Sequence, residues 1–187
     1  LGVMFELIRD INAAVDAGGV GAPDLPVLHF PDWEILAYDV FSPHQDIVSQ
    51  RIATLSQLHD IRQGVLIVPV TTLLHRLPPA SFYQGQTFAL DVGQTFNVDN
   101  TRRQLENAGY HCVDTVYEHG EYAVRGSIMD IFPMGQALPF RIELFDDEIE
   151  SLRTFDPDNQ RTLDKTEQVR ILPAREFPLD TGAIRTF

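Results

Sequence analysis

The apolar run at residues 64–70 constrains the fold of this chain more than any other segment. It reads Gly64-Val65-Leu66-Ile67-Val68-Pro69-Val70, with no polar alternation and with chain-breaking residues at or near its ends. Such a run is typical of a central β-strand that is covered on both faces. Strands of that kind belong to layered α/β folds, so the run predicts a parallel sheet flanked by helices.

Segments that alternate with this strand support the same fold class. Residues 26–30 have the pattern of a short strand, and residues 3–17 that of an amphipathic helix. A further helix is expected after Ser42, with Ser42 as N-cap, Pro43 in the first turn and Gln45 completing a capping box. The apolar positions that this helix is expected to bury are Ile47, Val48, Ile52, Leu55 and Leu58. A short helix at 73–77 is expected to be capped by Thr71-Thr72 and ended by Pro78-Pro79.

The pattern changes to mostly strands after about residue 86. A helix at 97–108 is predicted to end at Gly109, and the remaining apolar segments have strand periodicity. Those strands are expected at Tyr117 and at 122–132, 139–145, 149–155 and 169–172, with turns at 146–148 and 156–159. We therefore predict two domains. Residues 1–86, with 174–187 returning to them, form a parallel α/β domain, and residues 87–173 form a mostly antiparallel α+β domain.

The charge of the chain limits its partners. Fourteen basic residues against 27 acidic ones give a net charge of −13, which argues against electrostatic binding to DNA or an anionic membrane. Lys165 is the only lysine and follows Asp164, so the Gly-Lys-Ser/Thr of a phosphate-binding P-loop is absent. No apolar stretch approaches the ~18 residues of a membrane span. The start at Leu1 has no signal-peptide pattern, and we expect a fragment.

The sequence shows no pattern of catalytic or metal-binding residues. Six histidines are scattered without the spacing of a zinc site, and the acidic residues from Glu143 to Glu150 lack the ligand spacing of an EF-hand. Cys112 is alone, which excludes an internal disulfide and favours a reducing compartment, and we expect it to be buried or inert. We expect no catalytic residue, no bound metal and no cofactor in this chain.

The segment at residues 140–145 is the most informative local pattern. Alternation places Phe140, Ile142 and Leu144 on one face and Arg141, Glu143 and Phe145 on the other. If the first face packs on the core, the second presents a guanidinium beside an aromatic ring, a combination enriched at protein-binding hot spots. The alternative is that Phe145 lies under a loop and that Arg141 and Glu143 are an ordinary surface pair.

Several longer strings resemble a known family. They are residues 30–34 (Phe-Pro-Asp-Trp-Glu), 38–47, 118–127, 130–135, 140–149 and 163–178. In these strings the chain resembles the UvrB-like N-terminal module of bacterial transcription-repair coupling factors (Mfd), over nearly all of its length after residue 26. The excision-repair subunit UvrB shares a looser version. Residues 38–42 here pass directly into a helix, where UvrB carries a tyrosine-rich DNA-binding hairpin.

The resemblance implies a fold and a partner. It implies a truncated RecA-like domain without a P-loop, into which a domain that binds UvrA is inserted. The positions that match the family's UvrA-contacting residues are Arg125, Arg141 and Phe145. In the whole proteins of this family, an ATP-driven motor moves on double-stranded DNA and releases stalled RNA polymerase, in the cytoplasm. Those activities belong to regions that lie outside this chain.

Two functions follow from these observations. The first is a non-catalytic module that recruits UvrA in transcription-coupled DNA repair. The alternative is a UvrB-type domain that binds damaged DNA or hydrolyses a nucleotide, which would need a phosphate loop or a basic aromatic surface.

Overall fold

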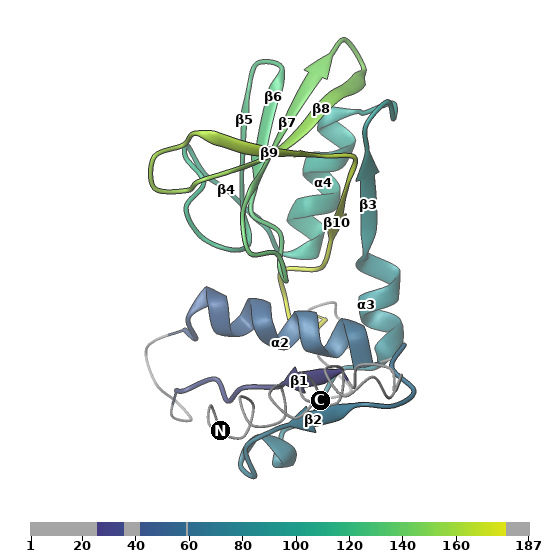
Figure 1. Ribbon diagram of the computed structural model, residues 1–187, viewed down its shortest axis with the longest axis vertical. Helices are drawn as coiled ribbons and strands as arrows, with labels where there is room; N and C mark the ends of the chain where they lie inside the picture. Colours follow the sequence, from purple (N-terminus) through teal and green to yellow (C-terminus); the bar gives the residue numbers. More distant parts are fainter. Residues whose placement is uncertain (1–25, 36–41, 59, 179–187) are drawn as a thin grey trace, which may run out of the picture.

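The computed structural model describes residues 26–35, 42–58 and 60–178, and the helix predicted at 3–17 lies outside them. The chain combines helices with parallel and antiparallel strands, as the mixed α/β prediction required (Figure 1). The first elements are β1 (Val27–His29), α2 (Gln45–Leu58), β2 (Val65–Ile67), the 3-10 helix η1 (Thr72–Leu74) and α3 (Ala80–Gln86). They are followed by β3 (Phe88–Asp91), α4 (Val98–Ala108), β4 (His111–Cys112), β5 (Glu121–Arg125) and β6 (Ile128–Ile131). The last are β7 (Phe140–Phe145), β8 (Glu148–Phe155), β9 (Thr162–Thr166) and β10 (Gln168–Ile171).

Strands β1 and β2 run parallel and are joined through α2, which makes a β-α-β unit. Helix α2 packs on β1, where the hydroxyl of Thr54 donates a hydrogen bond of 2.7 Å to the carbonyl of His29. The prediction that residues 64–70 are covered on both faces is wrong for the described residues, because Leu66 is 41% exposed. Only residues 65–67 of the run form a strand, and the backbone at Pro69 already accepts the first hydrogen bonds of η1.

Two predicted helix caps are replaced by other contacts. Helix α2 begins at Gln45, and the imidazole Nδ1 of His44, not Ser42, accepts a 3.3 Å hydrogen bond from the first-turn amide of Asp46. Thr71 and Thr72 do not cap η1, since both hydroxyls donate to Oδ2 of Asp32 at 2.9 Å. Helix α3, which was not predicted, begins directly after Pro79. Proline is well suited to that position because it has no amide to satisfy.

Helix α4 has the predicted ends. The side chain of Asn97 accepts a 2.8 Å hydrogen bond from the amide of Asn100, and Gly109 closes the helix in the left-handed conformation with φ of 95°. The following strands form a six-stranded sheet in the order β4-β5-β6-β7-β8-β9, in which only the β4–β5 pair is parallel. Strands β3, β4 and β9 were missed, and the strand expected at Tyr117 does not form. The segment 122–132 is divided by a turn at Gly126 into β5 and β6.

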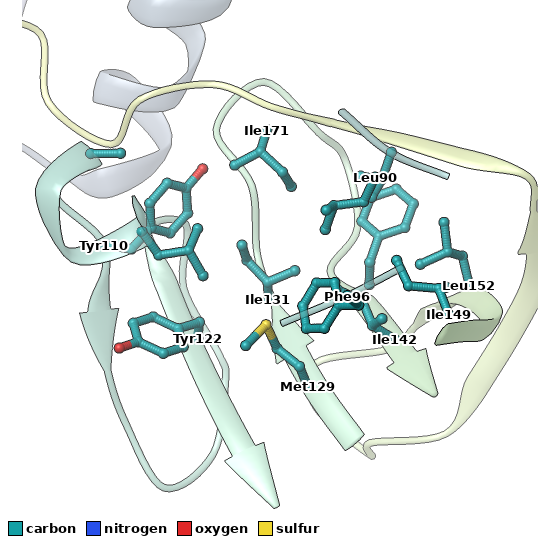
Figure 2. Packing of buried hydrophobic residues seen from close by; sticks show 14 residues of the cluster. Leu90, Phe96, Tyr110, Tyr122, Met129, Ile131, Ile142, Ile149, Leu152 and Ile171 are labelled. Carbon is teal, nitrogen blue, oxygen red and sulfur yellow. The ribbon is translucent and has the colours of Figure 1, made fainter. Parts of the chain in front are cut away.

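One face of the six-stranded sheet packs on the main hydrophobic core. Apolar side chains from β5 to β8 meet α4 and the antiparallel pair β3–β10 there (Figure 2). The buried members of this core include Leu90, Phe96, Leu105, Tyr110, Tyr122, Met129, Ile131, Phe140, Ile142, Ile149, Leu152, Val169 and Ile171. Because the core covers only one face, the side chains that alternate with these residues lie on the opposite face of the sheet.

The segment after β10 returns to the first elements through a buried ion pair. Arg51 on α2 donates two hydrogen bonds to the carboxylate of Glu176, from Nε at 2.8 Å and from Nη2 at 2.6 Å. The indole of Trp33 donates to the same carboxylate at 2.9 Å, and the hydroxyl of Tyr83 donates to the backbone carbonyl of Glu176 at 2.9 Å. The guanidinium also lies over the ring of Phe30. This cluster fixes residue 176 against α2.

Candidate protein-docking surface

The candidate surface lies on the face of the six-stranded sheet that points away from the main core. Strand pairing places Asp130 of β6 opposite Ala123 of β5 on one side and opposite Arg141 of β7 on the other. Paired residues of an antiparallel sheet share a face, so Arg125, Asp130 and Arg141 project from the same side. Phe140, Ile142 and Leu144 pack on the opposite side, in or against the core, which confirms the predicted alternation of β7.

Asp130 is a buried carboxylate that holds both arginines. Its side chain is fully buried, and its two oxygens accept hydrogen bonds of 2.8 Å from Nε and 2.9 Å from Nη2 of Arg141. Its Oδ2 also accepts a hydrogen bond from Nη2 of Arg125. Bidentate pairing of a planar guanidinium with a carboxylate is both strong and geometrically specific. The three residues therefore form a rigid cluster with one net positive charge.

The guanidinium of Arg141 is also held by two further contacts. Its guanidinium lies over the ring of Phe155, 4.9 Å from the ring centre, and its Nη1 donates to the backbone carbonyl of Gln160 at 3.3 Å. The hydrogen bonds to Asp130 raise the pKa of Arg141 above its usual value, so the group stays charged. Only 15% of the Arg141 side chain is exposed, so little of it is accessible to a partner.

Arg125 and Phe145 are the accessible members of the surface. Half of the Arg125 side chain is exposed, and Phe145, at the end of β7, is 70% exposed. Phe145 pairs with Glu148 across a tight turn in which Asp146 has a positive φ of 51°, so its position is set by the β7–β8 hairpin. Exposure of an aromatic ring on an ordered hairpin leaves a large apolar area ready for burial against a partner.

Glu143 lies between Arg141 and Phe145 on the same strand face. Its Oε2 accepts a 2.5 Å hydrogen bond from the hydroxyl of Ser151 and lies 3.8 Å from Nε of Arg153. The surface thus alternates positive and negative groups beside one exposed ring. Such a mixture is typical of a surface that recognises another protein.

Comparison with known protein families decides the relationship of the chain. The family model of the UvrB interaction domain matches residues 88–177, which carry the whole surface described above. Over 164 residues, 88% of this chain, the sequence is 54% identical to the transcription-repair-coupling factor of Escherichia coli (strain K12). It is 37% identical over 157 residues to that of Staphylococcus aureus (strain Mu50) and 31% identical over 154 residues to that of Bacillus subtilis (strain 168). The chain belongs to the transcription-repair-coupling factor family.

The chain spans a small part of these relatives. The matched segments amount to 14% of the length of the Escherichia coli transcription-repair-coupling factor and 13% of the length of the Staphylococcus aureus and Bacillus subtilis proteins. The similarity therefore concerns one segment of these much longer relatives.

The sequence predicted Arg125, Arg141 and Phe145 as contact residues, but Asp130 was not predicted. The structure brings the two arginines together on that carboxylate, while Phe145 lies four residues along β7 from Arg141, about 13 Å away. A signal for Asp130 was present in the sequence, because it is the only charged residue in the apolar stretch 128–132. A lone carboxylate in such a strand needs a buried cationic partner.

Outside this surface, the structure also bears on Cys112, on metal binding and on membrane-spanning helices. Cys112 was expected to be buried or inert, and the structure shows that it is exposed and not buried. Within the described residues, no three His, Cys, Asp or Glu side chains are grouped so that they could hold a metal ion. In the same part of the chain, no helix combines the length and the apolar character needed to cross a membrane.

Proposed function

We propose that this chain is a non-catalytic docking module that recruits UvrA in transcription-coupled DNA repair. The observation that carries the proposal is the exposed ring of Phe145 on the same face of β7 as the arginine pair held by Asp130. The match of residues 88–177 to the UvrB interaction domain supports UvrA as the partner, because the inserted domain that this region resembles is the one that binds UvrA.

Each residue has a distinct role in this proposal. Phe145 is the apolar anchor that becomes buried against UvrA. Arg125, which is half exposed, pairs with a carboxylate of UvrA and keeps its contact to Asp130. Arg141, with 15% of its side chain exposed, offers a small contact area and mainly keeps the cluster rigid. Because Asp130 and Phe155 already fix Arg141, binding costs little side-chain entropy there.

The finer description of the fold is part of the same proposal. We propose that β1, α2 and β2 belong to a truncated RecA-like domain, which comprises residues 1–86 together with 174–187. Residues 87–173 are then the inserted UvrA-binding domain. Two facts support an insertion: β3 and β10 pair with each other, so the chain enters and leaves this region side by side, and Glu176 afterwards binds Arg51 of α2.

The longer protein supplies the remaining activities in this proposal. The ATP-driven motor, the contact with RNA polymerase and the contact with double-stranded DNA lie in regions outside this chain, which itself needs no cofactor. The module works in the cytoplasm, where it links polymerase release to the excision machinery.

Calorimetric titration of the chain into UvrA tests the proposal. Phe145→Ala and Arg125→Ala should each weaken binding by about 30-fold or more, which corresponds to the ~2 kcal/mol typical of an anchor residue. Matched controls are Leu74→Ala, an exposed apolar residue on η1, and Arg170→Ala, an exposed arginine on β10. Both controls should bind within about twofold of the unmodified chain.

Unchanged affinity in both Phe145→Ala and Arg125→Ala would contradict the site. The UvrB-type alternative is measured on the same preparations, by a gel shift with damaged duplex at low salt and by an ATPase assay. A clear signal in either, together with no binding to UvrA, would replace the proposal with that alternative.

A further inference from the structure

Three cationic side chains lie next to one another across the outer strands of the six-stranded sheet. Arg141 of β7 is directly opposite Arg153 of β8, and Arg153 is directly opposite Lys165 of β9. Residues paired in this way share a face of the sheet, so the three side chains continue the surface that begins at Arg125. With neighbouring strands about 4.8 Å apart, the row extends roughly 10 Å beyond the arginine pair.

This row is an arrangement that lowers the stability of the sheet. Like charges directly opposite each other on antiparallel strands destabilise the pairing, and here two such pairs are adjacent. The chain carries almost twice as many acidic as basic residues, so acidic partners for the row would be easy to place. Lys165, the one lysine of the sequence, nevertheless lies in line with two arginines.

The charges of the outer two residues are poorly satisfied inside the chain. Arg141 is neutralised by Asp130, but the nearest acid to Nε of Arg153 is Glu143 at 3.8 Å, too far for a hydrogen bond. This Nε is buried and makes no hydrogen bond to the described residues. Lys165 is exposed and forms no ion pair with any described residue. Arg153, whose side chain is 32% exposed, and the exposed Lys165 are therefore the cations of the row that an external carboxylate can reach.

We propose that Arg153 and Lys165 extend the docking surface across β8 and β9 and bind a line of carboxylates on the partner protein. The inference rests on the proposed function, because the same face carries Arg125, Arg141 and Phe145. It adds a direction to the interface: the partner's acidic groups follow the row of paired residues across the strands, while its apolar pocket receives Phe145 at the hairpin.

Carboxylates of a protein fit this row better than the phosphates of a nucleic acid. A polyanion would also meet Glu143, which is partly exposed on the same face, and the net charge of −13 of the chain. A protein can place single carboxylates opposite the cations and leave space at the acids. The exposed ring of Phe145 next to the row agrees with such a mixed surface.

The test neutralises each outer cation and keeps its aliphatic stem. Titration against UvrA is expected to show binding about tenfold weaker for Arg153→Gln and about threefold weaker for Lys165→Gln. Most of the loss for Lys165→Gln should lie in the association rate and should disappear in about 0.5 M salt. Arg170→Gln, the same change on an exposed arginine of β10, is the matched control and should leave binding unchanged.

Stability distinguishes a binding role from a structural one. Because the row is repulsive, Arg153→Gln and Lys165→Gln should leave the melting temperature unchanged or raise it, and a clear drop in both would overturn the inference. Unchanged affinity in both variants, with Phe145→Ala still weakened, would overturn the inference and leave the proposed function intact. No binding of UvrA by the unmodified chain would overturn both. Loss of duplex DNA binding with unchanged UvrA binding would assign the row to nucleic acid instead.

Discussion

Asp130 receives both hydrogen bonds of the bidentate pair with Arg141 while its own side chain is completely buried. A carboxylate in that position is stable only because two guanidinium groups satisfy it, since burying an unpaired charge is very costly. Arg125 and Arg141 are therefore held in place by a residue that no partner can reach. The candidate surface is kept rigid by this carboxylate buried beneath it.

Replacing Asp130 with asparagine should destabilise the fold strongly. The amide has nearly the same size, but it offers one acceptor to two cations and leaves Arg141 largely buried without its counter-charge. We expect a loss of about 3 kcal/mol in the free energy of unfolding, measured by urea titration. The control is Asp114→Asn, the same change at an exposed position, which should alter that free energy by no more than about 0.5 kcal/mol. Equal effects of the two changes would contradict the account.

Glu176→Gln should weaken the attachment of the returning segment to α2. Arg51 is completely buried and would lose the charge that balances it, so a loss of about 3–5 kcal/mol in unfolding free energy is expected. Urea denaturation measures the loss, with the exposed Glu167→Gln as control. Changing both members to methionine should cost less than Glu176→Gln alone, because no charge then remains buried. A double variant less stable than the single one would refute this reasoning.

Substitutions at two glycines distinguish the cost of backbone strain from the cost of close packing. Gly126 and Gly135 both have positive φ, 60° and 79°, but a Cβ at Gly126 meets no atom within 4 Å. A Cβ at Gly135 would lie 3.0 Å from Cβ of Ala53 on α2 and 3.1 Å from Cδ1 of Leu172. We expect Gly126→Ala to cost about 1 kcal/mol from strain alone, and Gly135→Ala about 1–3 kcal/mol more. Thermal unfolding of both variants measures the difference, and equal melting temperatures would show that α2 does not pack closely on this loop.

Asp32 should contribute stability that is lost in acid. Hydrogen bonds from the hydroxyls of Thr72 and Thr71 hold the pKa of Asp32 below its usual value. A carboxyl group with a lowered pKa in the folded state stabilises the fold above its unfolded-state pKa, and this contribution disappears as the pH falls through the folded-state pKa.

The stability difference between the unmodified chain and Asp32→Asn should therefore be largest near about pH 6 and should shrink as the pH falls below about 4. Urea titrations over that pH range measure this stability difference. Asp99→Asn, at the first turn of α4, is the control, which tests whether the loss of any carboxylate gives the same dependence of stability on pH. A difference that stays constant with pH would show that the two hydroxyls do not stabilise the charged form of Asp32.

Local patterns in the sequence were sufficient to predict those elements whose ends and faces depend only on neighbouring residues. Helix α4 lies within one residue of the predicted 97–108 and ends at Gly109 as expected, and the alternation in β7 placed Arg141 and Phe145 on the outer face. Both depend on backbone geometry over a few residues, which a sequence records directly. The resemblance to a family added Arg125, which alternation alone did not distinguish.

Contacts between distant segments were not predictable in the same way. Ser42 had the pattern of an N-cap, but the imidazole of His44 takes that role, and the Thr71-Thr72 pair binds Asp32, about 40 residues earlier. An arginine in a helix usually faces solvent, and only the contact with Glu176 explains why Arg51 is buried. A charged residue is buried only where a distant partner satisfies it, and no local pattern contains that partner.

The sequence by itself determined which faces of the strands are apolar, where α4 begins and ends, and which family the chain resembles, because periodicity and turn chemistry act over a few residues. The tertiary structure decided which charges meet. Pairing of β5, β6 and β7 brought Arg125 and Arg141 onto Asp130, and pairing of β8 and β9 aligned Arg153 with Lys165. Strand register is set by the fold of the whole domain, and a shift of one residue would move all of these side chains to the other face.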